Sequence, residues 1–167
     1  KHLVLGNRFK KHSLPLAYDV INKLQEIEWE IDSETYTHEK QTNRAMNKQK
    51  FLRVIKDYLG IPFHFVWRYD CRGRSYSSGY DLNLQSNEYG KALLSLHKKE
   101  LVTASGLPNL YIAIANHAGM DHLTWQDRYK WAKATPPDSI NWKEPILGRK
   151  AVRALKDTEE CKATGYV

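Results

Sequence analysis

The spacing of apolar residues predicts a chain that is mostly helical. Between positions 16 and 31, apolar residues recur every three or four positions, which indicates one helix of about four turns. The members of this stripe are Leu16, Val20, Leu24, Ile27 and Ile31. The polar segment 33–50 shows no such stripe. A second helix is predicted over 51–59, where Gly60 and Pro62 end the pattern.

The rest of the chain adds a short β-region and further helices. The aromatic and β-branched run 63–69 predicts a strand, and 75–84 predicts a second short strand or a turn. Helical spacing follows over 89–97, 110–118 and 145–158. Thr124, with Asp127 three residues later, predicts the N-terminus of a helix over 125–134. The fold class expected is therefore α+β, mostly helical, with one small β-sheet near the middle.

Composition places the chain among folded, non-membrane proteins. Its 167 residues are 41% apolar and 27% charged, which suits one domain or a piece of something larger. No apolar run is long enough to span a membrane, and the N-terminal apolar stretch is too brief for a signal peptide. Cys71 and Cys161 lack the spacing of a disulfide scaffold or a zinc site, so we expect reduced thiols in a cytoplasm.

The charge balance favours a polyanionic partner. The chain carries 26 Lys and Arg against 19 Asp and Glu, a formal net charge of +7. Such a balance makes nucleic acid the first candidate, although charge alone does not name the partner.

Candidate chemistry is concentrated in residues 68–76, whose sequence is Arg-Tyr-Asp-Cys-Arg-Gly-Arg-Ser-Tyr. Arginine binds phosphate through two parallel hydrogen bonds, glycine allows close backbone approach, and tyrosine stacks on bases or ribose. One interpretation is a nucleic-acid contact. The other is a surface hairpin in which Asp70 fixes one of the arginines through a salt bridge.

Other reactive side chains do not form convincing sites. His117 and His122 are five residues apart, so they do not share a helical face, and we expect them and His97 to be exposed or hydrogen bonded. The acidic run 26–34 is interpreted as a solvated face. The serines at 75, 77 and 78 lack a motif that would activate a nucleophile. Helix 110–118 is interpreted as packed core rather than a ligand groove.

Residues 70–74 resemble the Asp-x-x-Gly-Arg motif of the single-subunit DNA-dependent RNA polymerases of bacteriophages and mitochondria. Four further stretches resemble the same family in the same order along the chain. They lie at 20–25 with 29–31, at 63–65, at 85 with 90–96, and at 115–121 with 128–131.

This resemblance implies the thumb-base and palm-base part of a right-hand polymerase. Residues 1–60 would form a helical region with a reduced thumb, because only about a dozen residues separate Ile31 from Arg44. Residues 61–167 would form the palm-base region that carries the motif, packed with the preceding helices as one unit.

The resemblance also implies a function that depends on further protein. The chain is most similar to the smaller chain, or the N-terminal part, of a two-polypeptide phage RNA polymerase. It would position template DNA and nascent RNA at an active site whose metal-binding aspartates lie on another chain or segment. Mg²⁺ would bind in the assembled polymerase but not to this chain, and no catalytic residue is expected here. The implied partners are a second polypeptide, template DNA, nascent RNA and ribonucleoside triphosphates, in the cytoplasm of an infected bacterial host. A non-catalytic nucleic-acid-binding module is the alternative.

Within the motif, the resemblance assigns Arg74 to the template or the RNA–DNA hybrid, with Arg72 as the alternative. Asp70 and Gly73 are expected to hold the turn. The other nucleic-acid contacts expected along one groove are Arg44, Lys48, Tyr76 and Lys91.

Overall fold

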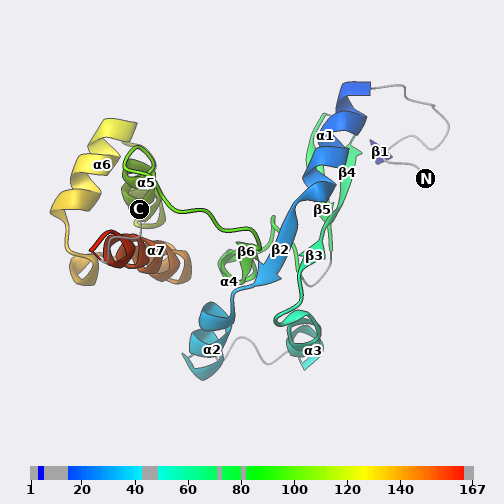
Figure 1. Ribbon diagram of the computed structural model, residues 1–167, viewed down its shortest axis with the longest axis horizontal. Helices are drawn as coiled ribbons and strands as arrows, with labels where there is room; N and C mark the ends of the chain where they lie inside the picture. Colours follow the sequence, from blue (N-terminus) through cyan, green and yellow to red (C-terminus); the bar gives the residue numbers. More distant parts are fainter. Residues whose placement is uncertain (1–3, 6–14, 43–48, 71–72, 80–81, 164–167) are drawn as a thin grey trace. The chain divides into compact units, whose positions relative to one another are not determined.

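The computed structural model describes residues 4–5, 15–42, 49–70, 73–79 and 82–163. The chain folds as two units, Lys1–Lys98 and Lys99–Val167, and each is described by itself. Figure 1 labels the helices and strands of both units.

One sheet of the first unit is built around a central strand. In this sheet β4 (Val66–Asp70) lies between β1 (Val4–Leu5), which runs parallel to it, and β5 (Ser75–Ser78), which runs antiparallel. Helix α1 (Pro15–Glu26) contacts β4, as the ribbon shows (Figure 1). The backbone N–H of Trp67 in β4 donates to Gln25 Oε1 of α1 at 3.3 Å. The hairpin that carries the Asp-x-x-Gly-Arg motif therefore has a helix as its support.

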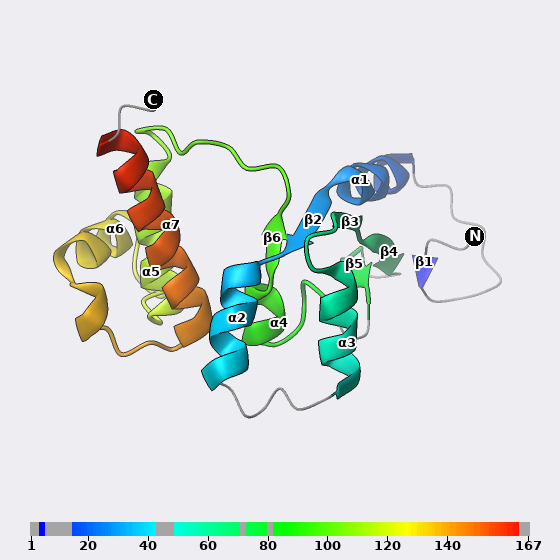
Figure 2. The ribbon, with the colours of Figure 1, turned by 60° about the horizontal axis from the view of Figure 1, so that its bottom comes forward.

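The second sheet has β2 (Glu28–Ile31) at its centre. Both neighbours, β3 (Phe63–His64) and β6 (Leu94–Leu96), run antiparallel to it. Three helices flank these strands along the chain: α2 (Ser33–Thr42), α3 (Gln49–Tyr58) and α4 (Glu88–Ala92) (Figure 2). Asp32 joins sheet and helix, because its carboxylate accepts the Thr35 N–H at 2.8 Å while its own N–H donates to Leu93 O at 2.8 Å.

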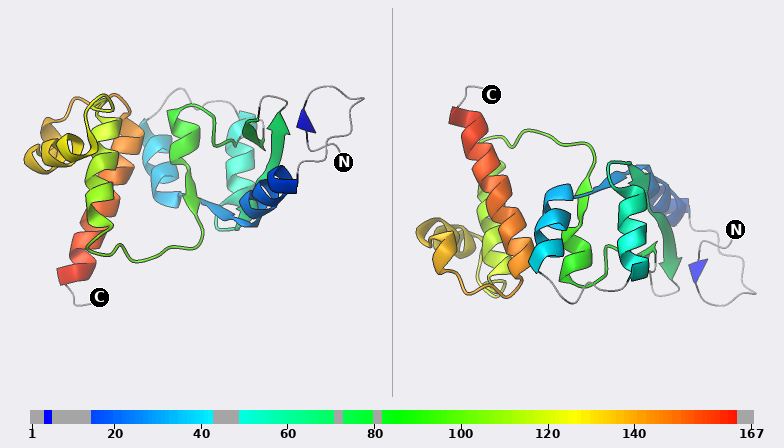
Figure 3. Two further views of the ribbon diagram at one scale, coloured as in Figure 1. Left: turned by 90° about the horizontal axis from the view of Figure 1, so that it is seen from above. Right: turned by 90° about the horizontal axis from the view of Figure 1, so that it is seen from below.

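The second unit is helical. It contains α5 (Leu107–His117), α6 (Trp125–Ala134), the 3₁₀ turn η2 (Pro137–Ser139) and α7 (Pro145–Ala163). Figure 3 shows α5, α6 and α7 gathered together. Its buried core consists of Ile114, Ala115, Ala118, Ala132, Ile140 and Leu155. A Cβ atom at Gly148 of α7 would overlap the Trp142 ring, so the glycine allows this ring to pack against the helix.

Several sequence predictions are confirmed. The α+β class holds, and about half of the chain is helical. The helices expected at 51–59, 110–118, 125–134 and 145–158 correspond to α3, α5, α6 and α7. The segment 75–84, expected to form a second short strand or a turn, begins with the strand β5 at Ser75–Ser78. Thr124 caps α6 as expected, because its hydroxyl oxygen accepts the Asp127 N–H at 3.2 Å. The strand expected at 63–69 forms, although it is divided at Phe65 into β3 and β4.

Other predictions are wrong. The stripe 16–31 does not make one helix, since α1 ends at Glu26 and 28–31 form β2, where Trp29 and Ile31 alternate with two glutamates. The helix expected over 89–97 ends at Ala92 because 94–96 pair with β2. A helix, α2, occupies part of the polar segment in which no stripe was seen. The described strands make two small sheets rather than one.

The division at residue 60 and the thumb-base and palm-base assignments stay predictions. None of the helices in the described ranges combines the length and the apolar character that crossing a membrane requires.

Candidate nucleic-acid interface

The Asp-x-x-Gly-Arg motif forms the turn of a β-hairpin. Arg68 pairs with Tyr76 and Tyr69 with Ser75 in the antiparallel register of β4 and β5. Beyond these pairs the Asp70 N–H donates to Arg74 O at 2.9 Å, and the Gly73 N–H donates to Asp70 O at 3.1 Å. This pattern is that of a three-residue hairpin loop, which places a left-handed residue at its last position.

Asp70 and Gly73 hold this turn, as the family resemblance implied. Gly73 has φ of 82°, a conformation that glycine adopts without a steric penalty. The Arg74 N–H donates to Asp70 Oδ1 at 2.9 Å, and the Asp70 side chain is buried. The carboxylate thus fixes the backbone of Arg74. Whether Asp70 and Gly73 also touch nucleic acid stays a prediction.

Replacing Asp70 by alanine should destabilise the hairpin. Asp70→Ala removes the acceptor of the Arg74 N–H, and we expect the free energy of unfolding to fall by about 1–2 kcal/mol. Urea unfolding followed by circular dichroism measures this loss. Asp70→Asn is the matched control, because the amide keeps an oxygen acceptor and should retain more than half of the lost stability. Equal losses in the two variants would contradict a role based on the acceptor geometry.

The outer face of the hairpin presents cationic and aromatic side chains. Alternation along the strands places Arg68 of β4 on the same face as Arg74 and Tyr76, while Trp67 and Ser77 occupy the opposite, buried face. Both arginines are exposed and Tyr76 is partly exposed. Within the part of the chain that the structure describes, no hydrogen bond or ion pair occupies these two guanidinium groups. The face therefore offers two available cations beside a phenol.

A polar network supports β5 from its buried face. Ser77 Oγ lies 2.9 Å from both Asn83 Oδ1 and Gln85 Oε1, to either of which it can donate its proton. The Ser77 N–H also donates to Gln85 Oε1 at 3.3 Å, and Asn83 Nδ2 donates to Gly79 O at 3.1 Å. These bonds hold the strand that carries Tyr76. The sequence singled out Gln85 through the family resemblance but gave no sign of its link to Ser77 and Asn83.

Lys91 is the exposed member of a packed helix. Its neighbours Tyr89, Gly90 and Ala92 are buried in α4, and the Gly90 N–H donates to Asn87 Oδ1 at 3.0 Å. The fixed backbone presents the lysine to solvent. Its place along a nucleic-acid groove stays a prediction.

Three residues expected in the groove, Arg44, Lys48 and Arg72, lie outside the described residues.

The family-like residues 115–121 and 128–131 are hydrogen bonded to each other within the second unit. The Arg128 guanidinium donates from Nη1 to Asn116 Oδ1 at 3.0 Å and from Nε to Leu123 O at 2.9 Å. It also donates from Nη2 to the carbonyl oxygen of Asp121. This arginine, the Arg128 clamp, ties α6 to the loop after α5, where Gly119 has φ of 90°. The arginine of this motif thus stabilises the fold, because each of its three guanidinium nitrogens donates a hydrogen bond within the second unit.

Two of the histidines are hydrogen bonded, as predicted. His117 Nδ1 lies 2.9 Å from Glu144 Oε2, and His97 Nδ1 lies 2.9 Å from Glu30 Oε2. His122 is exposed. No three His, Cys, Asp or Glu side chains among the described residues are grouped so that they could hold a metal ion.

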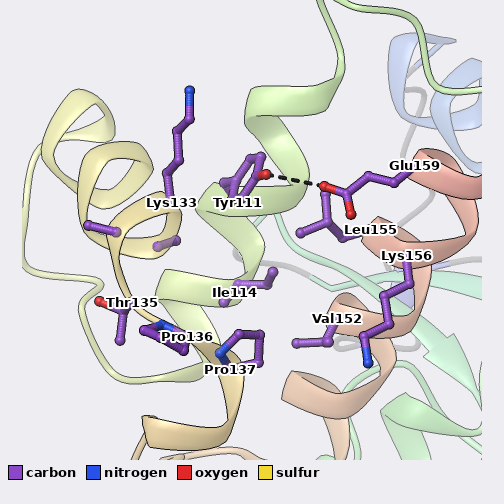
Figure 4. Close-up of a pocket in the computed structure, with 12 residues that line it drawn as sticks. Tyr111, Ile114, Lys133, Thr135, Pro136, Pro137, Val152, Leu155, Lys156 and Glu159 are labelled. Atoms are coloured by element: carbon purple, nitrogen blue, oxygen red, sulfur yellow. Dashed lines mark hydrogen bonds between the residues drawn. The ribbon is translucent and has the colours of Figure 1, made fainter. Parts of the chain in front are cut away.

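A pocket of about 340 Å³ lies in the second unit, between α5, α7 and the turn that follows α6. Figure 4 shows its apolar lining, with Val152 near Pro137 and Leu155 near Tyr111. The Tyr111 hydroxyl donates to Glu159 Oε1 at 3.5 Å at the edge. Burial, and then the negative charge of Glu159, raises the pKa of Tyr111 above its ordinary value. Helix α5 contributes Ile114 and Ala115 to the core, and the residue after its end, Ala118, also lies in the core, as predicted.

Comparison with known proteins links the chain to RNA polymerases. No family model matches it. It is 32% identical over 97 residues to the DNA-directed RNA polymerase of Pseudomonas phage phiKMV, a match that covers 58% of this chain and 12% of that protein. It is 28% identical over 118 residues to the mitochondrial DNA-directed RNA polymerase of Neurospora crassa, covering 69% of this chain and 8% of that protein.

A probable DNA-directed RNA polymerase of Neurospora crassa is 30% identical over 84 residues, covering 50% of this chain and 9% of that protein. The resemblance to phage and mitochondrial RNA polymerases that the motifs indicated is therefore confirmed. The matched part spans 8–12% of the length of these relatives.

Proposed function

We propose that this chain, a relative of the phage and mitochondrial DNA-directed RNA polymerases, is part of such a polymerase and positions template DNA and nascent RNA at its active site. In this proposal the metal-binding aspartates lie on another chain or segment, together with the Mg²⁺ ions. The partners are a second polypeptide, the two nucleic acids and ribonucleoside triphosphates, in the cytoplasm of an infected bacterial host. One observation carries the proposal, namely the outer face of the hairpin at the Asp-x-x-Gly-Arg motif.

The chemistry of that face suits a nucleic-acid strand. A guanidinium group donates two parallel hydrogen bonds to a phosphate and stays charged at every relevant pH. A phenol offers a flat surface to a base or a ribose. The net charge of +7 adds a long-range attraction for a polyanion.

The mechanical support of the face suits a positioning role. The backbone of Arg74 is fixed by Asp70 at the turn, and that of Tyr76 is held by the bonds that Ser77 makes on the opposite face. Side chains on a fixed backbone lose less conformational freedom when they bind, so they can orient a strand accurately. Such orientation is what phosphoryl transfer requires of residues that do not take part in the chemistry.

The test is Arg74→Ala in the assembled polymerase. Because one charged contact to the nucleic acid is lost, early RNA synthesis should fall by about tenfold. Arg74→Lys should restore part of it, since the charge remains while the bidentate geometry is lost. Arg53→Ala is the matched control, because Arg53 is an exposed arginine of α3.

The readouts are abortive and full-length RNA on a defined template, together with the affinity of the chain for that template. Weaker binding with unchanged synthesis would favour the non-catalytic nucleic-acid-binding module. Unchanged binding and synthesis at moderate salt would show that the hairpin face is not the interface.

A further inference from the structure

We propose that Arg68 is a further nucleic-acid-binding residue. With Arg74 it would hold the two phosphates that flank one nucleotide of single-stranded template, while the base of that nucleotide stacks on Tyr76. This inference rests on the proposed function and extends it to a residue outside the Asp-x-x-Gly-Arg motif.

The register of the hairpin puts these three side chains together. Arg68 lies directly opposite Tyr76, and two residues further toward the turn, on the same face, Asp70 lies opposite Arg74. Side chains directly opposite each other on antiparallel strands have Cβ atoms about 5 Å apart. Two residues along one strand, as from Arg74 to Tyr76, span about 7 Å. The phenol therefore has one guanidinium across from it and another beside it on the same face.

Exposure and charge leave Arg68 available for an anion. Its side chain is exposed, and it makes no hydrogen bond or ion pair with the rest of the described chain. Its strand neighbour on this face, Val66, is 57% exposed, so the described residues of the first unit leave the face largely uncovered at that point. The carboxylate on the same face, Asp70, is buried and accepts the Arg74 N–H at the turn. The guanidinium groups of Arg68 and Arg74 are thus two solvent-exposed positive charges beside Tyr76.

The phenol between the cations favours a single strand over a duplex. A base inside a duplex is covered on both faces by its neighbours, so it cannot stack on a side chain unless it is unpaired. Phosphate contacts alone would serve a duplex equally well. The combination of two arginines and one tyrosine therefore suits an unpaired nucleotide of the template, on either side of the RNA–DNA hybrid.

The experiment measures the affinity of the 167-residue chain for a labelled single-stranded DNA oligonucleotide and for an RNA–DNA hybrid over a range of salt. Arg68→Ala should weaken single-strand binding on the order of tenfold at low salt. It should also reduce the slope of log K against log salt by about 0.7, the value for one phosphate contact on a single strand. Arg68→Lys should keep the slope and recover part of the affinity. Tyr76→Ala should weaken binding without changing the slope.

The controls separate this inference from the proposed function. Arg53→Ala removes an exposed arginine elsewhere in the same unit and should leave both affinity and slope near those of the parent chain. If Arg68→Ala behaves like Arg53→Ala while Arg74→Ala weakens binding, the inference is wrong and the proposed function stands. If neither Arg68→Ala nor Arg74→Ala weakens binding, both are wrong.

Two further results would overturn the inference. An equal loss of affinity for the single strand and the hybrid would exclude the single-stranded template as the ligand. A fall in unfolding free energy for Arg68→Ala that matches the loss of binding would show that the arginine supports the hairpin rather than contacting DNA. We expect urea unfolding of Arg68→Ala to coincide with that of the parent chain, because the side chain is exposed.

Discussion

If the proposed function is correct, the 167-residue chain by itself is expected to incorporate no ribonucleotide into RNA, and incorporation is expected to begin when a polypeptide that carries the metal-binding aspartates is supplied. Nucleotidyl transfer of this kind uses two metal ions about 4 Å apart, held by fixed carboxylates. In the proposed function, those aspartates lie on another chain or segment. The matched part of the chain is also a small share, 8–12%, of its polymerase relatives.

The measurement is incorporation of a labelled ribonucleoside triphosphate on a single-stranded template with Mg²⁺. The chain and the polypeptide that carries the aspartates are assayed separately and together. A version of that polypeptide with the aspartates changed to asparagine is the control, and it should bind this chain without supporting synthesis. Metal-dependent RNA synthesis by the chain alone would show that its own residues include a catalytic site.

Helices with strong local signals could be predicted from the sequence. The start of α6 was predicted to the residue because a capping threonine and the aspartate three positions later act on adjacent backbone groups. The end of α5 was likewise marked by Gly119, whose positive φ favours glycine. In both places the deciding interactions are local, and a single sequence records them.

Strand β2 could not be predicted, because its signal competes with a longer helical one. Its residue Ile31 continues the helical spacing of Leu24 and Ile27, and this suggests a single helix. The strand forms because Trp29 pairs with Phe63 on one side and Leu96 on the other. Those partners are more than 30 residues away, so no local pattern contains the information.

Helix α2 was missed for a related reason. It has no apolar stripe, and its start is fixed by the buried Asp32, which accepts the Thr35 N–H and, at 3.2 Å, the Ser95 hydroxyl proton. The second of these bonds reaches across the sheet. Burial of Asp32 therefore depends on β6 being in place, which the sequence order does not reveal.

In the candidate interface, the turn of the hairpin could be predicted, but the hydrogen bonds that support its strand β5 could not. The Asp-x-x-Gly spacing is a local signal, and Asp70 and Gly73 act as expected. The network of Ser77, Asn83 and Gln85 depends on a loop folding back along β5, and the sequence offers only polar residues there. The exposed position of Arg68 opposite Tyr76 likewise appears only once the register is known.

Polar side chains have different roles in the hairpin at the Asp-x-x-Gly-Arg motif and in the family-like residues 115–121 and 128–131. In the hairpin, Arg68 and Arg74 are exposed, and their guanidinium groups are available to a ligand. In the second unit, the guanidinium group of Arg128 donates hydrogen bonds to the Asn116 side chain and to two backbone carbonyl oxygens. Arginines in two stretches that both resemble polymerases therefore have different roles. Replacing an exposed arginine of the hairpin should weaken ligand binding, whereas replacing Arg128 should reduce stability.

Replacing Arg128 by alanine should destabilise the second unit strongly. The change removes the donor of two partly buried acceptors, Asn116 Oδ1 and the Leu123 carbonyl oxygen, and of one exposed acceptor, the Asp121 carbonyl oxygen. Unpaired groups of this kind cost about 1–3 kcal/mol each when buried, and water can reach some of them here. We therefore expect a total loss of about 2–4 kcal/mol in unfolding free energy.

Hydrogen exchange monitored by mass spectrometry locates this loss, which should appear as faster exchange in α5 and α6 and leave the β4–β5 hairpin unchanged. Arg128→Lys should restore only a small part, because one ammonium group cannot reach three acceptors that a planar guanidinium meets together. Lys130→Ala, an exposed change on the same helix, is the control and should alter stability by less than about 0.5 kcal/mol.

Since Arg68, Arg74 and Tyr76 lie in the first unit, single-strand binding should persist in Arg128→Ala. Loss of binding without loss of stability would instead make Arg128 part of the nucleic-acid interface.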